Sequence, residues 1–340
     1  MVMKETENLR NTYVLNRGSY DSPTRLVKPS TPEVVLKFDE QKYSSDRIGL
    51  SKWFFDKDNP LTSRVTVNRL WQQFFGIGIV ATPDDFGSQG NKPFNPELLD
   101  WLAYTFQNKD NWDTKKFIKR IVMSSTYKQS SKVKKENRLK DSDNTYLANY
   151  PRQKLSAEMI RDNALATSGM LVEKIGGPSV KPMQPPNLWN EVTGGGGGSL
   201  AFYVPDTGDN LFRRSLYTFW KRTVPPPSMM IFDAPTRDFC VPVRQKTSTP
   251  LQSLALMNDP QYQLAAENLS ESIFKEKISI DEKILKLYRT VTGRTPIEIE
   301  LIKLKKFFIE IKKLNDIEDQ KAFNSLTVLV YNLDETTQKS

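Results

Sequence analysis

Basic and aromatic side chains alternate through residues 211–246, LFRRSLYTFWKRTVPPPSMMIFDAPTRDFCVPVRQK. The segment holds seven basic and two acidic residues, so it contributes +5 of the chain's net charge of +9. Guanidinium groups bind carboxylate, sulfate or phosphate oxygens in pairs, and aromatic rings offer flat faces to sugars or bases. The segment therefore predicts a surface that recognises an anionic ligand. Its candidate ligand-binding residues are Arg213, Arg214, Tyr217, Trp220, Arg222, Asp233, Arg237, Cys240 and Arg244.

The same arginines could instead brace a buried turn. In that interpretation, their guanidinium groups satisfy buried backbone carbonyls and pair with Asp233 and Asp238. The residue types fit both interpretations equally, so the sequence alone leaves the choice open.

The chain contains no histidine, which narrows the catalytic chemistry open to it. Ser-His-Asp and Cys-His machinery, histidine zinc sites and C-x-x-C-H haem attachment are all excluded. Acid–base catalysis would have to use Asp, Glu, Lys, Tyr or the single cysteine. Arg237 and Arg244 would favour a Cys240 thiolate, but without a histidine base we expect a buried, inert thiol. No catalytic residue is assigned, and no cofactor is expected in this chain.

Two pairs of carboxylates invite a metal-site interpretation. Asp206 and Asp209, in DTGDN, resemble part of a calcium loop but lack the full ligand ladder of an EF-hand. Glu158 and Asp162 stand one helical turn apart, where ion pairs at the surface are the commoner outcome. Neither pair is specific enough to predict a metal site.

The positive charge, with a pI near 9.3, suggests acidic partners such as anionic polysaccharide or nucleic acid, although lysines on solvated helix faces also produce it. The basic run 127–140 has few aromatic residues, which argues against nucleic acid. No apolar run reaches the roughly 18 residues that a transmembrane helix needs, and the first residues lack the apolar centre of a signal peptide. Composition alone therefore predicts a cytosolic protein without a transmembrane segment.

Helical patterns fill most of the chain around the central segment. Polar residues followed by proline predict helix starts at Asn59, Asn95, Thr249 and Asp259. Asp113 and Ser156 are further predicted caps, and the Ser156 helix is expected to continue through Val172 to Gly176. Later helices are predicted at 281–291, from Thr295 and at 318–331. The alternation of strands and helices typical of a parallel sheet is missing.

These patterns predict a mainly α fold: an irregular multi-helix domain with long proline- and glycine-rich loops and an extended N-terminal segment. Residues 1–45 carry scattered prolines and one possible short strand, TYVLNRGSY, so we interpret them as the remnant of an upstream inter-domain region. Residues 46–340 are expected to form a single helical domain. The pentaglycine run 194–198 predicts a mobile loop that could act as a lid or be a neutral insertion.

Several long motifs resemble the bacterial domain of unknown function 1553, the C-terminal PSD domain first noted in planctomycete proteins. They are NPLTSRVTVNRLWQQFFGIGIV, DDFGSQG, NPELLDWLA, KLSAEMIRDNAL, KIGGPSVKP, RRSLYTFWKRTVPPPSM, FDAPTRDFC and TSTPLQSLALMNDPQY. The resemblance extends over nearly the whole chain. One departure is visible at Asn95, where the family pattern commonly has histidine before Pro-Glu-Leu-Leu.

The resemblance implies a module of larger exported proteins that often carry a c-type cytochrome domain and a companion domain upstream, and sometimes a lectin-like domain. It implies a location in the periplasm or at the cell surface, and it suggests that this chain is a C-terminal fragment. In that context c-type haem is expected only in an upstream domain. The family has no established activity or catalytic residues to carry over.

Three functional hypotheses follow from these observations. The leading one is an accessory or ligand-recognition domain of an extracytoplasmic, cytochrome-linked protein that binds anionic polysaccharide. The first alternative is a histidine-independent enzyme that acts on an anionic or carbohydrate substrate through the arginine, aspartate and aromatic residues of 211–246. The second alternative, which the sequence supports least, is a nucleic-acid-binding protein.

Overall fold

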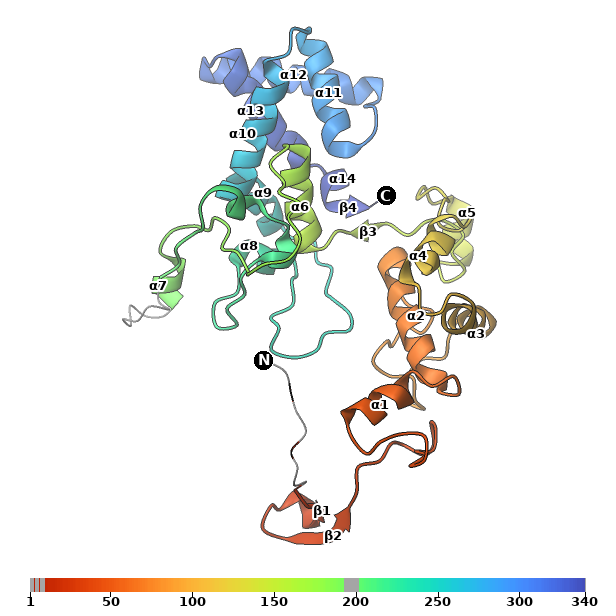
Figure 1. The fold of residues 1–340 in the computed structure, drawn as a ribbon. Coiled ribbons are helices and arrows are strands. Elements are labelled where there is room, and N and C mark those ends of the chain that lie inside the picture. Colours follow the sequence, from red (N-terminus) through yellow and green to blue (C-terminus); the bar gives the residue numbers. More distant parts are fainter. Residues whose placement is uncertain (1–2, 4–5, 7–9, 193–201, 340) are drawn as a thin grey trace. The chain divides into compact units, whose positions relative to one another are not determined.

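A computed structural model describes residues 3, 6, 10–192 and 202–339 of the chain (Figure 1). The chain divides into two compact units, Met1–Pro151 and Arg152–Ser340. Helices dominate both units among the described residues, which confirms the predicted mainly α class. The expected division into an extended segment and one domain from residue 46 stays a prediction.

The first unit begins with a hairpin and continues with helices. Its two strands, β1 (Thr12–Leu15) and β2 (Pro23–Val27), pair antiparallel, so the predicted short strand is real and has a partner. The helices are α1 (Arg47–Phe54), α2 (Pro60–Phe75), α3 (Pro96–Tyr104), α4 (Thr114–Val122) and α5 (Lys135–Lys140).

Predicted caps begin three of these helices. The side-chain oxygen of Asn59 accepts hydrogen bonds from the backbone of Leu61 and Thr62, and that of Asp113 accepts one from Lys116. Asn95 Oδ1 accepts the backbone N–H of Leu98 at 3.0 Å and so caps α3. The apolar faces of α2, α3 and α4 then meet in one core that includes Val67, Trp71, Phe75, Leu99, Leu102, Phe117 and Ile121.

The second unit is built around a group of long helices. It comprises β3 (Gln153–Lys154), α6 (Ala157–Thr167), α7 (Leu188–Val192), α8 (Pro227–Ile231), α9 (Pro250–Asn258), α10 (Pro260–Phe274), α11 (Ile280–Thr292), α12 (Glu298–Asn315), α13 (Asp319–Tyr331), α14 (Asp334–Thr337) and β4 (Gln338–Lys339). Helix α10 packs along α13. Helix α11 packs against both of these helices, and α6 packs against α10. Strand β4 pairs antiparallel with β3, which returns the chain's end to the start of this unit.

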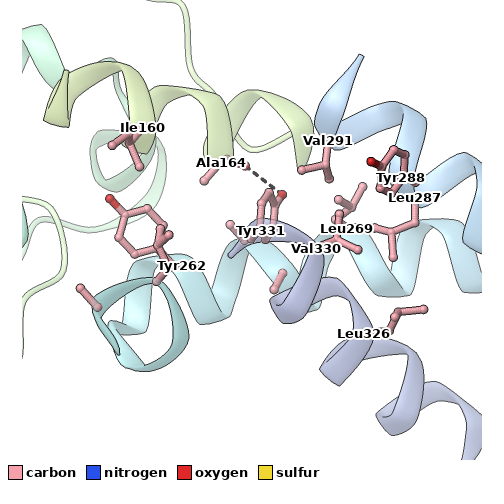
Figure 2. Packing of buried hydrophobic residues seen from close by; sticks show 14 of the residues in the cluster. Ile160, Ala164, Tyr262, Leu269, Leu287, Tyr288, Val291, Leu326, Val330 and Tyr331 are labelled. Carbon is pink, nitrogen blue, oxygen red and sulfur yellow. Dashed lines mark hydrogen bonds between the residues drawn. The ribbon is translucent and has the colours of Figure 1, made fainter. Parts of the chain in front are cut away.

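Side chains from α6, α10, α11 and α13 form the second core, as Figure 2 shows. Tyr262 and Leu269 come from α10, and Val330 and Tyr331 come from α13. The Tyr331 hydroxyl reaches back to the Ala164 carbonyl of α6 at 3.4 Å, so the same cluster fixes α6 to the bundle. Helix α6 also contacts residues 211–246, called the central segment below, through Arg161 and Asp162.

The sequence prediction of a longer helix from Ser156 is wrong at its C-terminal end. Helix α6 stops at Thr167, and Gly169 adopts a φ of +75°, a backbone conformation that suits glycine and ends a helix. Val172 lies beyond the helix and forms an isolated parallel bridge with Arg213. The chain just after α6 therefore pairs with the start of the segment 211–246.

None of the helices among the described residues is long and apolar enough to span a membrane.

Candidate functional site

A buried arginine on α6 anchors the start of the central segment. Arg161 is 2% exposed, and its Nη1 and Nη2 donate to the carbonyls of Arg213 and Leu211 at 2.9 and 2.8 Å. Its Nε donates to Gln261 on α10 at 2.7 Å, and its Nη1 also reaches Ser215 Oγ. Burial disfavours the charged guanidinium and so lowers the pKa of Arg161, and the hydrogen bonds to these acceptors offset part of that cost. Arg161 therefore holds the backbone of 211–215 against two helices.

Arg213 is an internal brace rather than an exposed cation. It is 2% exposed, and its Nη2 donates to the carbonyls of Lys174 and Gly176 at 2.9 and 2.6 Å. Its Nη1 donates to the Pro178 carbonyl at 3.2 Å, and its guanidinium carbon lies 3.9 Å from the centroid of the Tyr217 ring. The Tyr217 hydroxyl in turn accepts the backbone N–H of Gly176. Arg213 and Tyr217 together fold the 174–178 loop, as the buried-turn interpretation predicted for the arginines.

Two further arginines pair with the carboxylates of α6. Arg244 Nη1 lies 2.7 Å from Glu158 Oε2, and Arg214 Nε lies 3.8 Å from Asp162 Oδ2. Burial is the largest single influence and acts to raise the pKa of Glu158, but the hydrogen bond and charge of Arg244 together with hydrogen bonds from the backbone and Ser156 outweigh it, so the pKa falls below its usual value. Asp162 also accepts the backbone N–H of Ser215 at 2.7 Å. The expected ion pairs are confirmed, and both join α6 to the central segment.

Asp233 closes a loop, and within the described residues it forms no ion pair with an arginine. Its φ is +61°, and its carboxylate accepts the backbone N–H and the hydroxyl of Thr247 at 2.7 and 2.8 Å. Lys154 of β3 also donates to the Thr247 carbonyl. The predicted ion pairs of arginine with Asp233 and Asp238 are therefore wrong, because the acidic partners lie on α6 instead.

Cys240 lies at the far part of this loop and is exposed, so the expectation of a buried thiol is wrong. The neighbouring Phe239 is 72% exposed. The bonds of Asp233 with Thr247 fasten the loop at its ends, and the residues between them extend away from the core as the long connection between α8 and α9 (Figure 1).

Two of the remaining cations of the segment lie over tryptophan rings, one partly buried (Trp220) and one buried (Trp189). The guanidinium carbon of Arg237 lies 4.4 Å from the centroid of the Trp220 ring, and Lys221 Nζ lies 4.5 Å from that of Trp189. Arg222 is exposed and forms no hydrogen bond or ion pair with the rest of the described chain. We call Trp220, Lys221, Arg222 and Arg237 the Trp220 patch.

The Trp220 ring is fixed in place. Its Nε1 donates to the Thr236 carbonyl at 3.0 Å, and its ring packs against the core of the second unit. Arg237, next to Thr236, has a φ of +67°, so the backbone bends where its side chain returns over the ring. The hydrogen bond of the Trp220 ring and the backbone bend at Arg237 therefore hold these two side chains against each other.

The two weak candidates for a metal ligand, Asp206 and Asp209, have separate places in the fold. Asp206 Oδ2 accepts the backbone N–H of Lys181 at 3.0 Å, and Asp209 lies in a short 3₁₀ turn, Gly208–Phe212. Within residues 10–192 and 202–339, no group of three or more cysteine, aspartate or glutamate side chains is arranged to hold a metal ion.

Two small hollows flank Arg161, and both are also lined by Met183 and Gln261. Each has room for about one water molecule, so neither could enclose a sugar ring or a nucleotide. Thr218 Oγ1 and Gln184 Oε1 border the first hollow and are buried without a hydrogen-bond partner in the described structure. A single water bridging these two atoms would satisfy both.

The structure thus separates the nine predicted residues into three groups. Arg213 and Tyr217 brace a loop, and Arg214, Arg244 and Asp233 form internal ion pairs or hydrogen bonds. The third group comprises the exposed Arg222, Arg237 and Cys240 and the partly buried Trp220. Sequence analysis missed the role of Arg161. The available signal was its position on the buried face of α6, beside Ile160 and Ala164. The pentaglycine run 194–198, predicted to be a mobile loop, lies outside the described residues.

Comparison with known families, proteins and structures identifies the chain at the level of a family. A family model described as a protein of unknown function, PSD1 (DUF1553), matches residues 46–308 and spans both units. No curated protein and no solved structure matches. The matched region includes α6, the central segment and the Trp220 patch, and it covers most of the chain. The chain therefore belongs to the PSD1 family of unknown function, DUF1553.

Proposed function

We propose that this chain is a ligand-recognition domain that binds anionic polysaccharide through the Trp220 patch. The observation that carries the proposal is the exposed Arg237 guanidinium stacked on the fixed Trp220 ring. Stacking uses the flat face of a guanidinium and leaves its in-plane N–H groups free to bind a carboxylate or sulfate in pairs. Because the stack holds the side chain in position, less conformational entropy is lost when the anion binds.

The other cations of the patch extend the same chemistry. Lys221 and Arg222 follow Trp220 directly in the sequence, and Arg222 has no competing carboxylate partner in the described structure. Arg214 and Arg244, by contrast, are paired with the carboxylates of α6 and would have to leave them to bind a ligand. A polyanion with regularly spaced charges suits an open cluster of cations better than a single small anion does, because several weak contacts act together.

The proposed setting is an accessory domain of an extracytoplasmic, cytochrome-linked multidomain protein, located in the periplasm or at the cell surface. This setting rests on the family resemblance. The c-type haem of such an assembly would belong to an upstream domain, because the present chain lacks the histidine that attached haem requires.

The test compares charged and neutral forms of one polysaccharide. We expect the chain to bind dextran sulfate, not dextran, in isothermal titration calorimetry, with an affinity that falls as salt rises. Arg237→Ala should weaken binding about tenfold, which corresponds to about 1.4 kcal/mol, and Arg222→Ala should weaken it less. Arg289→Ala is the matched control because Arg289 is an exposed arginine on α11 of the same unit.

Equal affinities for the Arg237→Ala and Arg289→Ala variants would contradict the proposal. Tighter binding of single-stranded DNA than of dextran sulfate would replace it with the nucleic-acid hypothesis. Turnover of an anionic glycan that Asp233→Asn abolishes would favour the enzyme hypothesis instead.

A further inference from the structure

The hairpin of β1 and β2 exposes nearly all of its surface. Every residue of Thr12–Leu15 is exposed, and in Pro23–Val27 only Val27 is partly covered. Tyr13 and Leu26 are opposite each other in the register and are 40% and 55% exposed. The apolar side chains of this hairpin therefore have no core of their own.

A two-stranded hairpin of this kind is marginally stable in water, because it lacks a third strand or a packed face. The hairpin has some internal support: Thr24 Oγ1 donates to the Val14 carbonyl at 2.6 Å, and Asn16 N–H donates to the Ser22 carbonyl at 3.0 Å. Those bonds define the hairpin but leave the outer backbone edges of its strands unpaired, since the sheet has two strands only within the described residues. A third strand would both pair an edge and cover apolar surface.

The two outer edges differ in how well they accept another strand. Strand β2 carries Pro23, which has no N–H to donate, and Arg25, and both features block strand addition at an edge. Strand β1, Thr-Tyr-Val-Leu, has neither proline nor charge and consists of residues with high strand propensity. The open edge is therefore that of β1.

We propose that the outer edge of β1 binds an extended, acidic strand of another protein, which adds to the hairpin as a third strand. An unpaired row of backbone N–H and C=O groups forms its hydrogen bonds with another strand, so the partner segment must be extended. Charge fixes its composition: residues 10–28 contain Arg10, Arg17, Arg25 and Lys28 against Asp21 alone. A second copy of the hairpin would bring like charges together, so the partner is a different chain.

This binding element is separate from the region that defines the family. The family match begins at residue 46, whereas the hairpin ends at Val27, and the Trp220 patch belongs to the other unit. The hairpin therefore adds a protein-docking function that does not depend on polysaccharide recognition.

The test measures backbone hydrogen exchange in the full chain with a capped heptapeptide of alternating Glu and Val as the probe. At saturating peptide we expect the amides of Tyr13 and Leu15, which face the outer edge of β1, to exchange at least tenfold more slowly. Tyr13→Pro removes a donor from the outer edge of β1, because Val14 and Asn16 face β2, and it should abolish this protection. Tyr20→Pro is the matched control, because Tyr20 is 90% exposed and is the second residue of the 19–22 turn, where proline is favoured.

Two further probes test the pairing and the charge. The same peptide with N-methylated amides keeps its side chains but loses its donors, and equal protection by it would overturn strand addition. A peptide of alternating Lys and Val should protect the hairpin weakly, and equal protection by it would overturn the acidic partner. Protection that appears without peptide and grows with protein concentration would show self-pairing and would also overturn the proposal.

Discussion

Replacing Arg213 with methionine should destabilise the second unit without weakening its binding of anions. The side chain makes three hydrogen bonds to carbonyls and stacks on Tyr217. A hydrogen bond to a charged group contributes roughly 1.5–3 kcal/mol, so three could contribute about 6 kcal/mol if all the carbonyls stayed buried. Lys174 and Gly176 are exposed, however, and water can replace the lost donors there. Methionine also keeps part of the packing on Tyr217, so we expect a loss of about 2–3 kcal/mol.

Urea unfolding followed by tryptophan fluorescence measures this loss, with each unit's transition fitted separately. The folded Arg213→Met protein should bind dextran sulfate as the parent does, because the guanidinium is 2% exposed. The companion Arg237→Met variant should show the reverse pattern: nearly unchanged stability and weaker binding. A loss of stability below about 0.5 kcal/mol, together with loss of binding, would refute the structural role of Arg213.

Two further predictions concern other parts of the fold. The hydrogen bond from Arg294 lowers the pKa of Glu300 to about 2 from 4.5, so stability from this pair is complete above pH 4.5 and is lost as the pH falls towards 2. Since the Glu300 side chain is 30% exposed, we expect a loss of about 1–2 kcal/mol, which urea unfolding at pH 7 and pH 3 would detect and Glu300→Gln would remove. Gly78→Ala would place a Cβ 2.6 Å from Asn68 Nδ2 and from the Val80 carbonyl, which bond to each other inside the first unit. We expect it to cost about 2–4 kcal/mol by thermal unfolding, and a change below 0.5 kcal/mol would contradict that packing.

The parts of the fold that could be predicted from sequence depend on local chemistry. A polar residue before proline caps a helix through atoms within three residues of it, so Asn59, Asn95 and Asp259 could be identified without knowing the rest of the fold. The end of α6 was harder to predict. Apolar residues continue in sequence past Gly169, and only the conformation of that glycine shows that Leu171 and Val172 belong to the next segment.

The candidate site could be located from sequence but its residues could not be assigned. An arginine binds a backbone carbonyl, a carboxylate or a ligand with the same N–H groups, so its type does not reveal its partner. The partner of Arg213 depends on where the 174–178 loop lies, and the partners of Arg214 and Arg244 depend on the face of α6 that carries Asp162 and Glu158. These are tertiary contacts between residues 35 or more positions apart.

The neighbouring pair Arg213 and Arg214 shows why a dense arginine segment divides between inside and outside. Both residues have extended backbone conformations, with φ of −66° and −50° and ψ of 156° and 142°. At these polyproline-like angles successive side chains point in different directions, so Arg213 enters the 174–178 loop while Arg214 is exposed. This change of direction therefore makes some of these arginines structural in any fold that holds the segment against a core. Arg237, which is exposed and lies over an aromatic ring without an acidic partner among the described residues, is therefore the cation on which the proposed function rests.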